Sequence, residues 1–213
     1  MPKVRNHSKE ELEEILDQVP ADYYQKAITK NIWHSWKLKV ISELIKNKPN
    51  KILDVGCASG WFLDKVNKLY PEAELTGVDA SKKAIDYGKK VYKNLNLIHA
   101  DAHKLPFKDR SFDLILCTEV LDHVVEPEKV LSEIRRVLSP NGIAIVELDD
   151  SKNLFFRVIW YIWIHLPGSV WNHAHIHEFN IENLEEMIKK CKFQVIKKKI
   201  FRLGMGVVFL LKV

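Results

Sequence analysis

The sequence has few cysteines, no long apolar run and no strong excess of one charge. Its longest apolar stretch, residues 154–166, contains Arg157 and is shorter than the ~20 residues that a membrane span requires. Its three cysteines, Cys57, Cys117 and Cys191, lie far apart and in no metal-ligand spacing, which is typical of a reducing compartment. The polar N-terminus also lacks the apolar region of a signal peptide. We therefore expect a cytoplasmic protein without a membrane span.

The net charge of +5 is mild for a chain of 213 residues. Basic residues are scattered along the chain among nearly as many acidic ones, so the charge pattern demands no nucleic acid partner. A chain of this length suits a single domain with a full core.

The segment from Lys51 to Trp61 carries the most informative pattern. Residues 52–55 form a short β-branched run that is typical of a buried parallel strand. Gly56, Ala58 and Gly60 then make a turn of small residues, and an apolar helical period begins at Trp61. A strand, a small-residue turn and a helix form the first half of a nucleotide-binding βαβ unit.

The dinucleotide fingerprint Gly-x-Gly-x-x-Gly is not present in this turn. Its second glycine would fall on Ala58 and its third on Trp61. An NAD-dependent oxidoreductase is therefore disfavoured, although it is kept as an alternative.

Acidic residues end three successive predicted strands, at Asp54, Asp79 and Asp101. Asp79 lies at the spacing expected for the acid that binds ribose hydroxyls at the tip of a second strand. A carboxylate there accepts from two vicinal hydroxyls at once. Three acids at three strand ends are difficult to explain by structure alone.

The pattern Asp54-x-Gly56-x-Ala58-x-Gly60 resembles motif I of the class I S-adenosylmethionine-dependent methyltransferases. The segments 101–102, 105–107, 111–113 and 119–124 also follow that family's pattern nearly position by position, and the resemblance is close over residues 51–148. It implies methyl transfer from S-adenosyl-L-methionine to an oxygen, nitrogen or carbon atom. It also implies an adenine contact at Asp101. The residues to which cofactor binding is assigned are Asp54, Gly56, Cys57, Ala58, Gly60, Asp79, Ala80, Asp101, Ala102, Glu119 and Val120.

The implied fold is an α/β, Rossmann-like, seven-stranded and mostly parallel sheet with an antiparallel C-terminal strand and helices on both faces. Residues 1–48 are predicted to form an N-terminal helical lid segment, with Tyr23, Tyr24 and Trp33 as lid candidates and packing in the core as their alternative role. Residues 49–213 form the cofactor-binding domain, which contains an acceptor-side insert at 149–180.

The insert contains an apolar segment, residues 154–166, which is apolar on nearly every helical face. Such a helix is buried, faces a partner or touches lipid. Three readings therefore stay open: packing in the lid or core, a homodimer contact, and contact with a lipid-like acceptor or membrane surface.

Histidines 173, 175 and 177 alternate, so that an extended segment would place them on one face. Three imidazoles could bind zinc or iron. Methyl transfer from a sulfonium needs no metal, however, and no carboxylate pattern accompanies these residues. We therefore predict no metal site.

The expected reaction is an in-line displacement, accelerated by alignment and by exclusion of water. A base is required only if the acceptor keeps its proton near neutral pH. His123 is the first candidate and His177 the second, with packing as the alternative role for His123. Aromatic residues in the insert favour a small, partly apolar or ring-bearing acceptor, as in quinone biosynthesis. A cofactor-binding module without catalysis is the other alternative.

Overall fold

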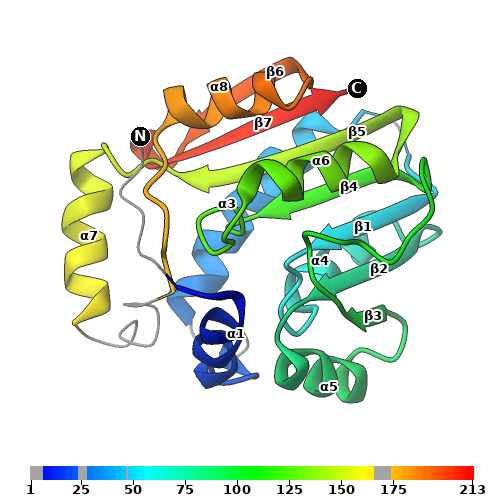
Figure 1. Ribbon diagram of the computed structural model, residues 1–213, viewed down its shortest axis with the longest axis horizontal. Helices are drawn as coiled ribbons and strands as arrows, with labels where there is room; N and C mark the ends of the chain where they lie inside the picture. The colour runs from blue at the N-terminus through cyan, green and yellow to red at the C-terminus, as the bar shows by residue number, and fades with distance from the viewer. Residues whose placement is uncertain (1–6, 24–27, 47, 166–173) are drawn as a thin grey trace.

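The computed structural model describes residues 7–23, 28–46, 48–165 and 174–213. Its centre is a seven-stranded sheet in the order β3-β2-β1-β4-β5-β7-β6 (Figure 1). Strands β1 to β5 pair in parallel, whereas β7 runs antiparallel to both β5 and β6. The strands are β1 Lys51–Val55, β2 Glu74–Asp79, β3 Asn96–His99, β4 Phe112–Thr118, β5 Leu138–Asp149, β6 Gln194–Phe201 and β7 Gly206–Lys212. The fold expected from the sequence is confirmed.

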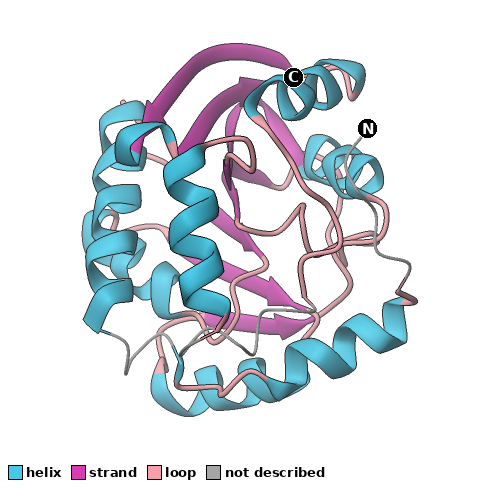
Figure 2. Ribbon diagram, turned by 90° about the vertical axis from the view of Figure 1, so that its left-hand side faces the viewer, coloured by secondary structure: helices cyan, strands magenta, loops and turns pink. Residues whose placement is uncertain are grey.

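Alternating side chains of the central strands fill two apolar layers, one on each face of the sheet. In β1, Ile52 packs into one layer, and Leu53 and Val55 pack into the other. Because helices cover both faces of the sheet, β1 carries buried apolar side chains on both faces, as is usual for a parallel strand. Helices cover both faces (Figure 2). They are α3 Ile28–Leu44, α4 Trp61–Leu69 and α5 Lys82–Val91 on one face, and α6 Pro127–Val137 and α8 Ile181–Lys190 on the other.

Local signals start several of these helices. The Ser81 side chain accepts a hydrogen bond from the backbone N–H of Ala84 and caps α5. Asn180 caps α8 in the same way and forms a reciprocal capping box with Asn183. These caps satisfy backbone donors that the first turn of a helix leaves unpaired.

Two further helices lie beyond the carboxyl ends of the parallel strands, one below the sheet and one to its left in Figure 1. The first is α1 Lys9–Gln18, which begins with a capping box between Ser8 and Glu11. The second is α7 Leu154–Ile164, within the predicted insert. Among the residues described, no helix is long and apolar enough to cross a bilayer.

Helix α7 is only partly covered by the rest of the molecule. Leu154, Phe155 and Tyr161 are between 61% and 70% exposed, which excludes complete packing of this helix within the core. Trp160 is half-buried and turns toward the carboxyl edge of the sheet, where it lines a cavity. The helix therefore has one face on the candidate site and another on the surface.

Candidate active site

A cavity of about 190 Å³ opens at the carboxyl edge of the sheet. The turn after β1, the ends of β2 and β3, the loop after β4, and helices α1 and α7 surround it. Its lining includes most of the residues that the sequence assigned to the cofactor: Gly56, Ala58, Asp79, Ala80, Asp101, Ala102, Glu119 and Val120. The remaining three, Asp54, Cys57 and Gly60, lie behind this surface, and Asp54 and Cys57 are buried.

The turn after β1 needs residues without large side chains. Gly56 has a φ of +76°, and a Cβ added to it would lie 2.3 Å from Cγ2 of Val120. The backbone N–H groups of Gly56 and Cys57 both donate to the carbonyl oxygen of Val78, at 2.8 and 3.0 Å. The tip of β2 therefore holds this turn close to the loop after β4.

Asp79 joins two loops at the base of the cavity. Its Oδ2 accepts from the N–H of Ala58 at 2.7 Å, and its Oδ1 accepts from the N–H of Ser81 at 2.8 Å. Burial raises the pKa of Asp79, while these two backbone hydrogen bonds oppose the rise. Each carboxylate oxygen has a further lone pair, so the group has capacity for hydroxyl donors of a ligand.

Asp54 has a different position from the one that a direct ligand contact would require. It is 2% exposed and lies within the core of β1. Burial raises the pKa of Asp54 to about 7, although the nearby charge of Lys37 lowers it. Asp54 therefore lies in the core next to the cavity and does not line it.

Asp101 is held by two neighbours on opposite sides. Its Oδ2 accepts from Nζ of Lys9 in α1 at 2.8 Å, and its Oδ1 accepts from Nδ1 of His103 at 2.6 Å. Burial alone would raise the pKa of Asp101, but these hydrogen bonds outweigh it and hold the pKa at about 2. The ion pair brings α1 directly over the adenine end predicted for the cavity.

A buried charge network connects helix α3 to the edge of the cavity. Lys37 of α3 is 1% exposed, and its Nζ lies 2.9 Å from Oε1 of Glu119 and 3.4 Å from Oε2 of Glu147. Arg202 lies 2.9 Å from Asp149 and 3.6 Å from Glu147. Burial would raise the pKa of Glu119, but Lys37 lowers it well below its usual value. Glu119 thus presents an ionised carboxylate to the cavity.

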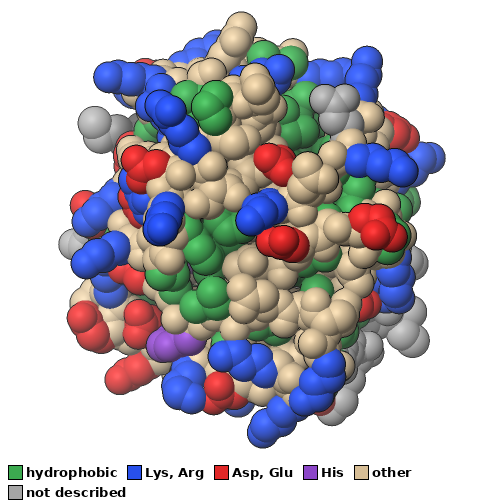
Figure 3. All heavy atoms as spheres, turned by 90° about the vertical axis from the view of Figure 1, so that its right-hand side faces the viewer, with side chains coloured by type: hydrophobic (Ala, Val, Ile, Leu, Met, Phe, Trp, Pro, Cys, Tyr) green, Lys and Arg blue, Asp and Glu red, His purple; other side chains and the backbone are tan. Residues whose placement is uncertain are grey.

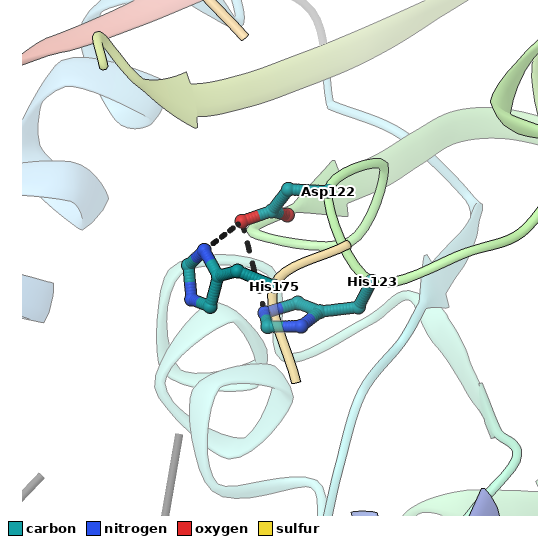
Figure 4. Close-up of side chains that lie close together, drawn as sticks. All are labelled: Asp122, His123 and His175. Atoms are coloured by element: carbon teal, nitrogen blue, oxygen red, sulfur yellow. Dashed lines mark ion pairs between the residues drawn. The ribbon is translucent and has the colours of Figure 1, made fainter. Parts of the chain in front are cut away.

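The other end of the cavity contains two imidazoles, a carboxylate and an indole. Asp122 and His123 come from the loop after β4, and His175 comes from the segment before α8 (Figure 4). Nδ1 of His175 lies 3.0 Å from Oδ2 of Asp122, whereas Nε2 of His123 lies 3.7 Å from the same oxygen. The two imidazole rings meet edge to face at 4.3 Å, and Trp160 lies 4.4 Å from the His175 ring.

The two histidines predicted as bases occupy different environments. His123 lines the cavity, and its Nδ1 donates to the carbonyl oxygen of Ala174 at 2.7 Å. His177 is 8% exposed and is not among the lining residues; its Nε2 donates to the carbonyl oxygen of Val124 at 2.9 Å. His173 lies outside the described residues. His175 and His177 both interact with the loop after β4, through Asp122 and Val124, although of the two only His175 lines the cavity.

Several lining residues carried no functional prediction. They include Lys9, Leu12 and Leu16 of α1, together with Trp160 of α7. The amphipathic period of α1 indicated an apolar face, but sequence alone does not say what that face covers. Tyr23 is not among the lining residues, and Tyr24 and the side chain of Trp33 lie outside the described part of the chain.

Comparison with known sequences gives matches over this region. Residues 53–146 match a family model described as a methyltransferase domain. Demethylmenaquinone methyltransferase of Thermotoga maritima is 26% identical over 215 residues, covering 93% of each chain. Demethylmenaquinone methyltransferase of Staphylococcus aureus is 34% identical over 114 residues, which are 52% of this chain and 47% of that protein. The second alignment therefore spans about half of that relative.

Solved structures also share the fold. One is a S-adenosylmethionine-dependent methyltransferase from Thermotoga maritima, described as a possible histamine N-methyltransferase. It superposes with a TM-score of 0.75 at 19% identity, covering 94% of this chain and 99% of its own. At 19% identity, this similarity shows a shared fold.

Proposed function

We propose that the acceptor of this chain, whose residues 53–146 match a methyltransferase domain, is a hydroxylated aromatic ring of the reduced naphthoquinone kind. The enzyme transfers a methyl group from S-adenosylmethionine to a small molecule. The observation that carries the choice of acceptor is the aromatic end of the cavity, where His123, His175 and Trp160 surround a carboxylate. The names of the two demethylmenaquinone methyltransferase relatives agree with this choice.

The opposite end of the cavity suits the cofactor. Gly56 and Ala58 leave the backbone accessible, and Asp79 offers lone pairs for ribose hydroxyls. We assign Asp101 and Ala102 to the adenine ring. Glu119 carries a negative charge, and we assign it to the cationic amino acid portion. The cofactor supplies a methyl group on a sulfonium, which is a good leaving group.

Helix α1 supports the proposed lid role of residues 1–48. Leu12 and Leu16 present apolar surface to the cavity, and Lys9 fastens the helix to Asp101. A closed lid excludes water from the site and fixes the alignment of the two substrates, which is where most of the acceleration of a methyl transfer arises.

We propose that the exposed face of α7 contacts a second copy of the chain. Phe155, Val158, Ile159 and Ile162 follow helical spacing and are 45–61% exposed, so they form a continuous apolar stripe. A homodimer would cover this stripe beside the acceptor end of the cavity. By contrast, the face shown in Figure 3 mixes Lys and Arg with acidic side chains, a pattern that does not favour nucleic acid as the acceptor.

The test is a transfer assay with S-adenosylmethionine labelled on its methyl group. The acceptors are reduced 1,4-naphthoquinone, its 2,3-dimethyl analogue with both ring positions blocked, an aromatic amine and transfer RNA. Transfer to the unblocked naphthoquinol and not to the blocked analogue supports the proposal and places the methyl group on carbon. Transfer only to the amine or to RNA would reject it. Titration with NAD in place of S-adenosylmethionine tests the oxidoreductase alternative.

A further inference from the structure

Several hydrogen bonds join the segment that contains His175 to the loop after β4. The backbone N–H groups of Ile176 and His177 both donate to the carbonyl oxygen of Asp122, at 2.9 and 3.2 Å. The side chains of His123 and His177 add hydrogen bonds to the carbonyl oxygens of Ala174 and Val124. These ties hold His175 at a defined place although it lies 53 residues from Asp122 in the chain.

Asp122 determines which nitrogen of His175 carries a hydrogen. The carboxylate is buried, which would raise its pKa, but His123 and His175 outweigh this effect and hold the pKa at about 2. Asp122 is therefore ionised near neutral pH and accepts from Nδ1 of His175 at 3.0 Å. A neutral imidazole that donates through Nδ1 has its lone pair on Nε2.

The surroundings place this imidazole at the cavity. His175 lines the cavity with its side chain 29% exposed, and Trp160 and His123 support the ring from two sides. Within the described part of the chain, the titratable groups in contact with it are Asp122 and His123.

We propose that His175, oriented by Asp122, is the catalytic base that removes the hydroxyl proton of an aromatic acceptor. This inference rests on the proposed function, since only a hydroxylated acceptor supplies such a proton. It replaces His123 and His177 as the base. His123 donates its Nδ1 hydrogen to a neutral carbonyl group, and burial lowers its pKa, so it accepts a further proton poorly. His177 is committed to Val124 outside the cavity lining.

The step balances without a further reactant. The hydroxyl proton moves to Nε2 of His175, and the carboxylate of Asp122 stabilises the resulting imidazolium. Electron density passes to the adjacent ring carbon, which bonds to the methyl carbon while the carbon–sulfur bond breaks and its electron pair stays on sulfur. The methylated carbon then releases its hydrogen to water as a proton. The imidazolium returns its proton to the oxygen, so one proton leaves per turnover.

Two variants of the dyad and one control separate this role from a structural one. They are His175→Gln, Asp122→Asn and, as the control, His165→Gln, which replaces an exposed histidine bonded to the carbonyl group of Tyr161. Loss of a general base lowers kcat by about 100-fold or more. The loss caused by His175→Gln should shrink as the acceptor hydroxyl is made more acidic, because an acceptor that is already ionised needs no base. The affinity for S-adenosylmethionine should stay within about threefold in both variants.

A chromophoric ligand gives a readout that does not require turnover. 4-Nitro-1-naphthol changes its absorption when it ionises, and it should bind to the wild-type protein as the naphtholate at a pH at which the free compound is mostly neutral. In His175→Gln it should bind as the neutral naphthol. Failure of the wild-type protein to bind it, or equal ionisation in both proteins, would overturn the inference even if a different acceptor is methylated. If dialysis against EDTA abolishes the activity of the wild-type protein, a metal ion and not the His175–Asp122 pair is required, and the inference is wrong. If the naphtholate forms as expected but no naphthol or quinol is methylated, the dyad stands and the proposed function is wrong.

Discussion

Nζ of Lys37 lies 2.9 Å from Oε1 of Glu119, and this buried contact connects α3 to the loop that borders the cofactor end of the cavity. Glu147, which is fully buried, shares the same ammonium group at 3.4 Å. Removing one partner of such a network leaves uncompensated charge in the core, which costs about 3–5 kcal/mol.

We therefore expect Lys37→Met to lower the free energy of unfolding by about 3–5 kcal/mol at pH 8, measured by urea denaturation. In the variant, Glu119 loses its ammonium partner and Glu147 keeps the guanidinium group of Arg202 at 3.6 Å, so the folded state binds protons that the unfolded state does not. The stability of the variant relative to the wild type should therefore rise as the pH falls from 8 to 5. Lys39→Met, on the exposed face of the same helix, is the control and should change stability by less than about 0.5 kcal/mol. An equal deficit at both pH values would contradict the network.

The turn at Gly56 gives a prediction that separates backbone strain from a steric clash. Gly56 and Gly204 both have positive φ, at +76° and +86°. Alanine should cost about 1–2 kcal/mol at either position from backbone conformation alone. At Gly56 the new Cβ also meets Val120, whereas at Gly204 it meets only the end of the Asn153 side chain at 2.9 Å.

Gly56→Ala should therefore destabilise the protein more than Gly204→Ala and should also weaken S-adenosylmethionine binding. The double variant Gly56→Ala/Val120→Ala should recover part of the lost stability, because it removes the atom at 2.3 Å. Thermal unfolding and calorimetric titration measure the two effects. Equal destabilisation by the two single variants would show that the contact with Val120 relaxes without cost.

The sheet and most of the cavity-lining residues at the strand ends were predictable because their signals are local. β-Branched runs between turn residues marked the strands, and acids at strand ends marked Asp79 and Asp101. The charge network was not predictable, because Lys37, Glu147 and Arg202 are distant in sequence and meet only after folding. In the sequence, Lys37 also interrupts an apolar helical stripe, a position at which a lysine is expected to face solvent.

The acceptor end shows a second limit. The alternation of His175 and His177 predicted a shared face, on the assumption of a regular strand. Both imidazoles interact with the loop after β4, but the two successive backbone N–H groups that donate to the carbonyl oxygen of Asp122 depart from a regular strand, and of the pair only His175 lines the cavity. A periodic pattern in the sequence does not predict such tertiary hydrogen bonds.

Asp79 should be the strongest single contributor to cofactor affinity. We expect Asp79→Asn to raise the Kd for S-adenosylmethionine roughly tenfold or more, because a neutral amide replaces a charged acceptor for hydroxyl groups. Burial raises the pKa of Asp79, so the carboxylate gains its proton at a higher pH than usual. The wild-type affinity should accordingly fall as the pH is lowered from 8 toward 5, while the affinity of the variant stays nearly constant.

Calorimetric titration at several pH values measures both effects of this substitution. Asp86→Asn is the matched control, since Asp86 is exposed on α5, pairs with Lys82 and lies outside the cavity lining. Its affinity should equal that of the wild type. An Asp79→Asn variant that binds as tightly as the control would remove the ribose assignment.

The apolar stripe on α7 predicts a dimer that can be dissociated without damage to the cofactor end. Phe155 and Ile159 are 61% and 45% exposed and lie one turn apart, so a glutamate at both positions places two charges in the centre of the contact. We expect the wild-type protein to show the mass of a dimer in light scattering after gel filtration, and Phe155→Glu/Ile159→Glu to show that of a monomer.

Val91→Glu, at an exposed apolar position in α5, is the control and should stay dimeric. Because Trp160 of α7 lines the cavity, the monomer should bind S-adenosylmethionine normally but methylate its acceptor more slowly. A wild-type monomer, or an unchanged mass in the double variant, would show that α7 does not form this contact.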